Sequence, residues 1–343
     1  MSTIDFHVHV FPNPVEKVLP GALGQAQKIL PEGSKLKEKL SPYLDPTLVS
    51  MGLGMARRMA RQLLEPTQDK MHEAQVWMRH LPGMARAGLD QLGGVATLPR
   101  LLVESTPEDL LEAMDAAGVD QAVVIAHPPF ASNDWVLEVC AQNSDRLIPV
   151  VNIPKGTESP GRKLEDYLDQ GARALKIHAA ADGEGPESAR YRELLEVAQA
   201  KKLPVILHTG CIQNRLFYKD PGFGKVEAFE PWFEAYREIP FILAHMNFHE
   251  PERAIQMGEL HSNVSVDTSW QPPEMIGEAV RRLGSGRVLF GSDWPFVGGN
   301  LAIGKKRIEE GVSAGVYTQD DADKILGGNA MRLILGGVDA AMA

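Results

Sequence analysis

The sequence predicts an α/β protein folded as a (β/α)8 TIM barrel with a helical insertion after strand 1. From residue 105 onward, short runs rich in Val, Ile and Leu alternate with longer amphipathic stretches. Strands that are apolar on both faces are typical of a parallel sheet covered by helices. With the opening run the strands number eight, and eight βα units in 343 residues favour a closed barrel. The predicted strands are residues 3–10, 119–126, 146–153, 172–178, 204–208, 240–245, 262–268 and 287–292.

Helix signals lie between these strands. Residues 105–117, STPEDLLEAMDAA, begin with Ser and Thr as candidate caps, a Pro and acidic residues, and residues 187–202 form another helix pattern. An open, doubly wound sheet is the alternative fold. It lacks support, because no glycine-rich phosphate loop follows the first strand.

Residues 13–104 interrupt the alternation. The segment is too long for a βα loop, and Met51, Met55 and Met59 fall on one face of a predicted helix. We expect helices that pack against the barrel, or that form a lid or a dimer surface, because Met adapts to variable partners. A homodimer is therefore possible, and residues 1–343 are expected to form one domain.

Charge and cysteine content exclude some functions. The net charge of -10 disfavours nucleic acid as a partner. The two cysteines give neither a disulfide framework nor metal-ligand spacing, which fits a reducing compartment. No apolar run has the length needed to cross a membrane, and no signal-peptide pattern opens the chain. We expect a cytoplasmic protein without nucleic-acid or membrane partners.

The first strand, TIDFHVHV, carries the clearest chemical signal. Successive side chains of a strand point to opposite faces. Strict alternation then places the apolar side chains of this strand toward the helices and the polar ones toward the barrel interior. Two imidazoles two residues apart on the interior face can converge on one metal ion. The apolar set is Ile4, Phe6, Val8 and Val10, and the polar set is Asp5, His7 and His9.

Further ligand-type residues end other predicted strands. His178, His208 and His245 end strands four, five and six, and Asp293 follows strand eight. A lone His at a strand end is more often structural than functional. Four such residues on the face where TIM barrels build their active sites, together with the first-strand pair, indicate a metal site.

Several segments in this order resemble the amidohydrolase superfamily. They are IDFHVHVF, ALKIHAA, LPVILHTG, FILAHMN, RVLFGSDWPF and GNAMRLI. The resemblance is narrower to the branch that contains aminocarboxymuconate-semialdehyde decarboxylase and γ-resorcylate decarboxylase. It covers the strands from end to end but not residues 13–104.

The resemblance implies a ligand set and a cofactor. His7, His9, His208 and Asp293 match metal ligands, and Asp293 also handles a proton. His245 matches a catalytic histidine that orients water or substrate without binding the metal. Three His and one carboxylate leave a position open for water, as a catalytic zinc site requires. We expect one divalent metal, Zn²⁺ first, with Mn²⁺ or Fe²⁺ as alternatives.

The substrate-binding residues are less specified. Lys176 shares a strand face with His178, and we expect both to bind an anionic group of a small-molecule substrate. Some binuclear relatives bridge two metals through a carboxylated lysine on strand four, which makes Lys176 a candidate bridge, but we favour one metal. Trp294 is a candidate to line a pocket for a planar substrate, and loop packing is its alternative role.

Three functions fit these residues. The first is a hydrolase that attacks a carbonyl C–O or C–N bond of a small acid, ester, lactone or amide with metal-activated water. The second is a nonoxidative decarboxylase of an aromatic or unsaturated acid, which needs the same ligands. The third is a barrel that binds metal without catalysis. We favour the hydrolase, because KIHAA and ILHTG resemble a broad hydrolase branch.

Overall fold

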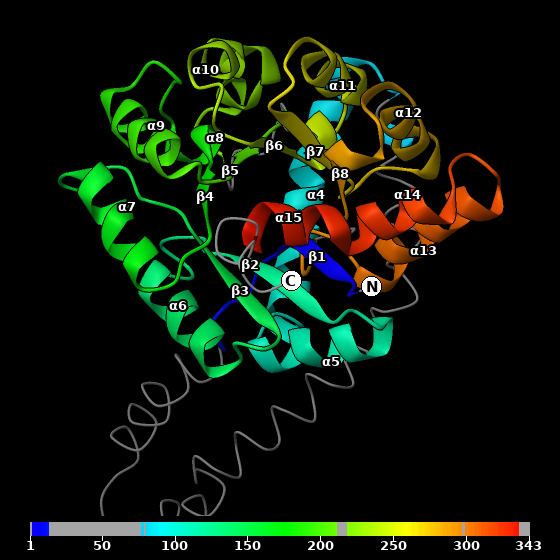
Figure 1. Ribbon diagram of the computed structural model, residues 1–343, viewed down its shortest axis with the longest axis horizontal. Coiled ribbons are helices and arrows are strands. Elements are labelled where there is room, and N and C mark those ends of the chain that lie inside the picture. Colours follow the sequence, from blue (N-terminus) through cyan, green and yellow to red (C-terminus); the bar gives the residue numbers. More distant parts are fainter. Residues whose placement is uncertain (1, 14–76, 79, 211–217, 297–298, 336–343) are drawn as a thin grey trace, which may run out of the picture.

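The computed structural model describes residues 2–13, 77–78, 80–210, 218–296 and 299–335 (Figure 1). Within these ranges, the side chains of residues 93–99 and 335 are not described. Eight parallel strands follow one another around the sheet in chain order. This confirms the predicted barrel and its strand count. The strands are β1 Ile4–Val8, β2 Gln121–Ile125, β3 Leu147–Val151, β4 Ala174–Ile177, β5 Val205–His208, β6 Phe241–Ala244, β7 Val264–Asp267 and β8 Val288–Leu289.

Backbone hydrogen bonds beyond the short strand β8 join it to β1. The amide of Phe6 donates to the carbonyl of Phe290, and that of His9 donates to Trp294, both at 2.7 Å. In return, the amide of Asp293 donates to the carbonyl of His7 at 2.7 Å. The segment after β8 is therefore held against the first strand, and both of its predicted histidines lie along this seam.

Helices cover the outside of the sheet, as Figure 1 shows. The two helices that were predicted in detail are present: α5 has Thr106 and Asp109 as a capping box with Pro107 at its start, and α9 is capped by Ser188. The α-helices are α4 Gly83–Val103, α5 Pro107–Ala117, α6 Asn133–Gln142, α7 Pro160–Asp169, α8 Ala179–Asp182, α9 Ala189–Lys201, α10 Glu230–Ala235, α11 Pro251–Leu260, α12 Pro273–Leu283, α13 Leu301–Ser313, α14 Gln319–Asp323 and α15 Asn329–Leu335. Short 3-10 segments are η2 Pro221–Gly224, η3 Val226–Phe229, η4 His245–Asn247 and η5 Ser285–Arg287, and η6 Lys324–Gly328 is a π-turn.

The core has two parts. The larger cluster lies between the strands and the surrounding helices. A smaller cluster joins alternate residues of most strands, such as Ile206 and Ile242, to Ala330 and Ile334 of α15. Because α15 also contacts β1 and β8, it closes the end of the barrel where the strands begin. The interior is therefore apolar at that end.

The strict alternation predicted for the first strand is wrong in part. The register between β1 and β2 shifts between Asp5 and Val8. Before the shift, Ile4 and Phe6 pack in the interior cluster, whereas Val8 packs in the outer one. The strand thus changes face within one element, and bulges of this kind re-aim side chains beside active sites.

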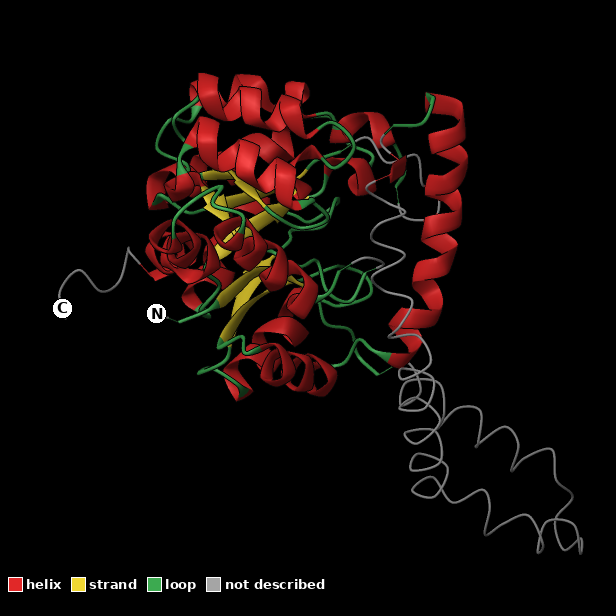
Figure 2. Ribbon diagram, turned by 90° about the vertical axis from the view of Figure 1, so that its right-hand side faces the viewer, coloured by secondary structure: helices red, strands yellow, loops and turns green. Residues whose placement is uncertain are grey.

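Helix α4 forms most of the described part of the predicted insertion. Figure 2 shows it as the long helix beside the barrel, on the side away from the start of the chain. Residues 14–76, with Met51, Met55 and Met59, lie outside the described residues, so a lid or dimer surface stays a prediction, as does the single domain. No helix within the described part of the chain is both long and apolar enough to span a membrane.

Candidate metal centre

Three predicted ligands meet where the strands end. Asp293 Oδ1 lies 3.4 Å from the Nε2 atoms of both His7 and His9. Among the described residues, these three form one of two groups whose potential ligand atoms all lie within 4.8 Å of one another. All three side chains are buried. The arrangement can hold a small cation between two ring nitrogens and one carboxylate oxygen.

The outer nitrogens of both histidines are held by the protein. His7 Nδ1 lies 2.8 Å from Asp267 Oδ2, and His9 Nδ1 lies 3.0 Å from the carbonyl oxygen of Ile125. Neither oxygen can donate, so each Nδ1 carries the proton. Each neutral ring then directs the lone pair of Nε2 toward Asp293. Carboxylate and carbonyl partners of this type orient the histidines of metal sites.

The predicted ligand His208 lies beside this group but not within it. Its Nδ1 is 3.2 Å from His245 Nε2, and its ring stacks on His178 with centroids 3.7 Å apart. Its own Nε2 is buried and has no hydrogen-bond partner among the described residues. A buried ring nitrogen without a partner is costly unless something binds it. We therefore keep His208 as the proposed fourth ligand.

His245, the second predicted catalytic residue, has partners on both ring nitrogens. Nδ1 lies 2.8 Å from Ser269 Oγ, and Nε2 faces His208. Its amide donates to Asp267 Oδ1 at 2.8 Å. His7, His245 and Asp267 also form the second compact group of potential ligands. Since hydrogen bonds already join its members, we interpret it as support for the first group.

Burial keeps these imidazoles neutral. Desolvation lowers the pKa of His7, His208 and His245 well below the ordinary value and that of His9 to about 3. For His7 and His9 the charge of Lys176 lowers the pKa further. Neutral imidazole is the form that binds a metal. The donor set therefore suits a divalent cation at neutral pH.

Lys176 reaches into the same group from β4. Its Nζ lies 3.4 Å from His7 Nε2. Burial lowers its pKa to about 8, while the carboxylates of Asp267 and Asp293 oppose that shift. Burial in turn raises the pKa of Asp293 well above its ordinary value, and Lys176 opposes this. A carboxyl group and an ammonium group thus lie together in a site shielded from water.

His178 directly follows the last residue of β4 and caps α8. Its Nδ1 accepts a hydrogen bond from the amide of Ala181 at 3.1 Å, so the neutral ring carries its proton on Nε2. Tyr218 packs beside both His178 and His208 with ring centroids 5.2 Å away. His178 therefore offers a donor, which fits its predicted role toward an anionic group.

Aromatic rings line one side of the centre. The ring of Phe296 lies edge-on to that of His9 with centroids 5.1 Å apart, and Phe11 and His127 lie 5.9 and 6.0 Å from Phe296. We call Phe11, His127 and Phe296 the aromatic wall. The wall thus places two phenyl rings and one imidazole beside His9.

Trp294 does not belong to this wall, which corrects its predicted role. Its side chain is 1% exposed and packs in the outer hydrophobic cluster. Its Nε1 donates to Glu104 Oε1 at 3.4 Å. The residue thus fixes the segment after β8 to the end of α4, and we assign it the packing role.

Helix α4 brings buried charges to the loops of this end. Arg100 donates from Nη1 to the carbonyl of Phe296 at 2.9 Å and from Nε to Glu104 at 3.2 Å. Asp90, nearer the start of the helix, lies 2.9 Å from His249 Nε2. Two loops of the barrel, after β6 and after β8, are therefore tied to the insertion.

The backbone at these strand ends adopts left-handed conformations. The φ angles of His245, Trp270 and Asp293 are 59°, 66° and 60°. Such values are uncommon for residues other than Gly and persist where the surrounding structure enforces them, often at functional sites. They turn each side chain at the point where its strand ends.

Sequence reasoning missed Asp267, Ser269 and Arg100. Asp267 is fully buried at the end of β7, and its Oδ1 also accepts from the amide and the hydroxyl of Ser269. The sequence signal that could have identified Asp267 is its position as the carboxylate that ends an apolar strand. Arg100 carries no local signal, because only the packing of α4 brings it to the site.

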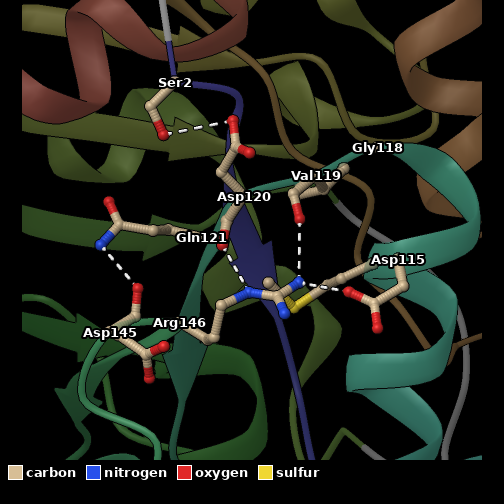
Figure 3. A pocket seen from close by; sticks show the side chains of 9 residues that line it. Ser2, Asp115, Gly118, Val119, Asp120, Gln121, Asp145 and Arg146 are labelled. Atoms are coloured by element: carbon tan, nitrogen blue, oxygen red, sulfur yellow. Dashed lines mark hydrogen bonds and ion pairs between the residues drawn. The ribbon is translucent and has the colours of Figure 1, made fainter.

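A surface pocket of about 830 Å³ lies at the opposite end of the barrel (Figure 3). There Arg146 donates to the carbonyl of Asp120 and to Asp115 Oδ1, both at 2.8 Å, and Asp120 Oδ2 accepts from Ser2. These polar groups form hydrogen bonds with one another. The end of a TIM barrel where the strands begin usually contributes to stability rather than to catalysis. We assign the pocket a structural role.

A TIM barrel with a His, His and Asp cluster at the ends of its strands defines a class of metal-site enzymes. A family model described as "Amidohydrolase" matches residues 4–334. The chain therefore belongs to the amidohydrolase family, in its amidohydrolase-2 branch, and is an enzyme of that superfamily. This confirms the resemblance stated from the sequence.

Solved structures agree on the fold. An uncharacterized TIM-barrel protein of Bordetella bronchiseptica is 21% identical with a TM-score of 0.57, over 67% of this chain and 83% of that one. A 2,6-dihydroxybenzoate decarboxylase is 19% identical with a TM-score of 0.52, over 66% and 87%. 4-Oxalomesaconate hydratase of Rhodopseudomonas palustris is 16% identical with a TM-score of 0.57, over 99% and 97%. No curated protein matches the chain by sequence.

Proposed function

We propose that the protein is a metal-dependent hydrolase that cleaves a carbonyl C–O or C–N bond of a small anionic ester, lactone or amide. The observation that carries this proposal is the convergence of His7 Nε2 and His9 Nε2 on Asp293 Oδ1, each at 3.4 Å. Both rings present lone pairs, and the carboxylate between them completes a cation site.

The donor set fits a single divalent metal held by His7, His9 and Asp293, with His208 as the fourth ligand. The buried Nε2 of His208, which has no partner in the part of the chain that the structure describes, supports that last assignment. Nitrogen and oxygen ligands of this type suit Zn²⁺, with Mn²⁺ or Fe²⁺ as alternatives. When bound, the metal supplies Lewis-acid polarisation of a carbonyl and lowers the pKa of water.

The chain's own residues supply the proton transfers and the binding. Asp293 takes a proton from the attacking water and passes it to the leaving group. Lys176 and the Nε2 of His178 bind the anionic group of the substrate, and the aromatic wall covers its apolar part. Burial of Asp293, Lys176 and His178 excludes bulk water from these groups, which strengthens their electrostatic contacts.

The second candidate is a nonoxidative decarboxylase of an aromatic acid. The aromatic wall beside His9 supports it, because a planar ring stacks or packs edge-on there. In that reaction Asp293 or water delivers a proton to the ring carbon as carbon dioxide leaves. The same ligands serve both reactions, so the pocket decides between them.

A paired assay tests both candidates. Metal content is measured on purified protein after metal-replete expression, and then aromatic acids, lactones, esters and amides are screened for carbon dioxide release and for acid release. We expect about one metal per chain and acid release from a lactone, ester or amide. Carbon dioxide release alone selects the decarboxylase. Protein that retains metal but turns over no substrate supports the third candidate, a barrel that binds metal without catalysis.

Two variants refine the assignment. Asp293→Asn keeps the shape of the side chain but cannot take up the proton, so we expect turnover to fall by about 10²-fold or more. Lys176→Ala tests the bridging-lysine alternative. Loss of a second equivalent of metal in that variant would establish a binuclear site, and we expect the metal content to stay at one.

A further inference from the structure

The carboxylate of Asp267 receives hydrogen bonds from four donors at the end of β7. Oδ2 accepts from His7 Nδ1 at 2.8 Å. Oδ1 accepts from the amide of His245 at 2.8 Å, the amide of Ser269 at 3.1 Å and the hydroxyl of Ser269 at 2.5 Å. Two of these donors are backbone amides, which can only donate. Both amides donate to Oδ1, which is therefore an acceptor, and as a carboxylate oxygen Oδ2 accepts from His7 Nδ1.

The acceptor role of Asp267 fixes the position of each proton along the hydrogen-bonded series Ser269, His245 and His208. The single proton of the Ser269 hydroxyl points to Asp267, so Ser269 Oγ must accept from His245 Nδ1, 2.8 Å away. With its proton on Nδ1, neutral His245 has only a lone pair on Nε2. That lone pair faces His208 Nδ1 at 3.2 Å, so His208 Nδ1 carries a proton. The remaining atom, His208 Nε2, is left with a lone pair, and no described residue offers it a hydrogen-bond partner.

We propose that Asp267 sets the tautomers of two metal-binding histidines, His7 by direct contact and His208 through Ser269 and His245. Ser269 and His245 are then positioning residues for His208 in this chain. The inference rests on the proposed metal site, and it explains why both ring nitrogens of His245 are occupied within the protein. Second-layer contacts of this type change metal affinity by about 10- to 100-fold when they are removed.

Removal of the Ser269 hydroxyl tests the longer branch alone. In Ser269→Ala, His245 Nδ1 loses its acceptor, and the proton can move to Nε2. His245 then donates to His208 Nδ1, which forces the proton of His208 onto Nε2 and blocks its lone pair. The contact between Asp267 and His7 is unchanged. The variant thus removes the preference for one tautomer at His208 and leaves His7 as it was.

The matched control is Ser285→Ala. Ser285 is also a buried serine whose hydroxyl donates to a carboxylate, Asp321 Oδ1, at 2.6 Å. It precedes β8, at the opposite end of the barrel from the metal site. Its loss costs stability but cannot reach the histidines. Ser269→Thr is the rescue variant, because it restores a hydroxyl at the same position.

Metal affinity is measured by chelator competition with Zn²⁺ and with Co²⁺, whose visible spectrum also reports the ligand geometry. We expect Ser269→Ala to bind both ions about 10- to 100-fold more weakly than the wild type. Ser269→Thr should recover most of that loss, and Ser285→Ala should bind as the wild type does. Wild-type affinity and an unchanged Co²⁺ spectrum in Ser269→Ala would overturn the inference.

A second measurement needs no variant and no metal. Nitrogen-15 NMR of the metal-free wild-type protein, labelled at histidine, reports which ring nitrogen carries each proton. We expect His7, His208 and His245 all to be protonated at Nδ1. A proton on His208 Nε2 would refute the inference even if the protein binds metal. Conversely, the expected tautomers in a protein that binds no metal would refute the proposed function and leave the proton arrangement established.

Discussion

Gly291 lies where the segment after β8 passes His7 and Asp267, two buried residues of the candidate metal centre. A Cβ built on Gly291 would lie 3.0 Å from His7 Cβ and 3.3 Å from Asp267 Cγ. Neither neighbour can yield easily, because His7 and Asp267 are joined by a hydrogen bond and both are buried. Gly291→Ala therefore forces these side chains apart by a few tenths of an ångström.

Two opposing terms set the expected size of this effect. Gly→Ala at a compatible position stabilises a protein by about 0.4–1 kcal/mol through the unfolded chain. An extra methyl group in a packed site costs about 1–3 kcal/mol. We expect Gly291→Ala to lower the free energy of unfolding by about 1–2 kcal/mol. A displaced His7 should also weaken metal binding by about tenfold.

The control is Gly286→Ala, in η5 at the other end of β8, where a Cβ meets no atom within 4 Å. Urea unfolding of the metal-free proteins gives the stability, and chelator competition gives the metal affinity. Gly286→Ala should be as stable as the wild type or slightly more so and should bind metal normally. If Gly291→Ala matches this control in both measurements, the close approach of the backbone to His7 does not constrain the site.

Three further predictions concern other parts of the molecule. Zn²⁺ at about 100 times its Kd should stabilise the metal-free protein by about 2.7 kcal/mol in a thermal unfolding assay, and an unchanged unfolding temperature would contradict binding to the folded state. The hydroxyl of Ser285, followed by Thr318, lowers the pKa of Asp321 to about 2, below the ordinary 3.8. The stabilisation by Asp321 is thus present above about pH 3.8 and is lost as the pH falls toward 2. The difference in free energy of unfolding between the wild type and Asp321→Asn, measured in urea, should therefore shrink from pH 7 to pH 3. A constant difference would reject this coupling. His249→Phe removes the partner at 2.9 Å from Asp90 and should cost about 1–3 kcal/mol. Hydrogen exchange should then quicken in α4 more than in β1, and equal changes in both would argue against a local role.

The barrel and much of its candidate site could be predicted from the sequence, because both follow from simple periodicities. A sheet covered by helices on one side and filled on the other needs runs of apolar residues, and the chain supplies eight. Since the strands are parallel, residues after them meet at one end. His178, His208, His245 and Asp293 could therefore be placed together from their positions alone.

The remaining features depend on contacts between distant segments. The bulge in β1 follows from its pairing with β2, so strict alternation misplaced Ile4 and Phe6. Trp294 precedes a proline in the loop after β8, and only its contacts with Glu104 and the outer hydrophobic cluster show that the ring is part of the core. Asp267 and Ser269 look like ordinary strand-end residues until His7 and His245 are brought beside them.

Helix α15, which closes one end of the barrel with Ala330 and Ile334, has a consequence for engineering. The apolar interior next to α15 supports the fold, whereas Lys176, His178 and the aromatic wall lie at the other end of the barrel. A library that randomises residues around Lys176, His178 and the aromatic wall therefore leaves the apolar interior at the other end of the barrel unchanged. Such variants should express and refold even after their chemistry has changed, which makes this barrel a suitable starting point for altering substrate range.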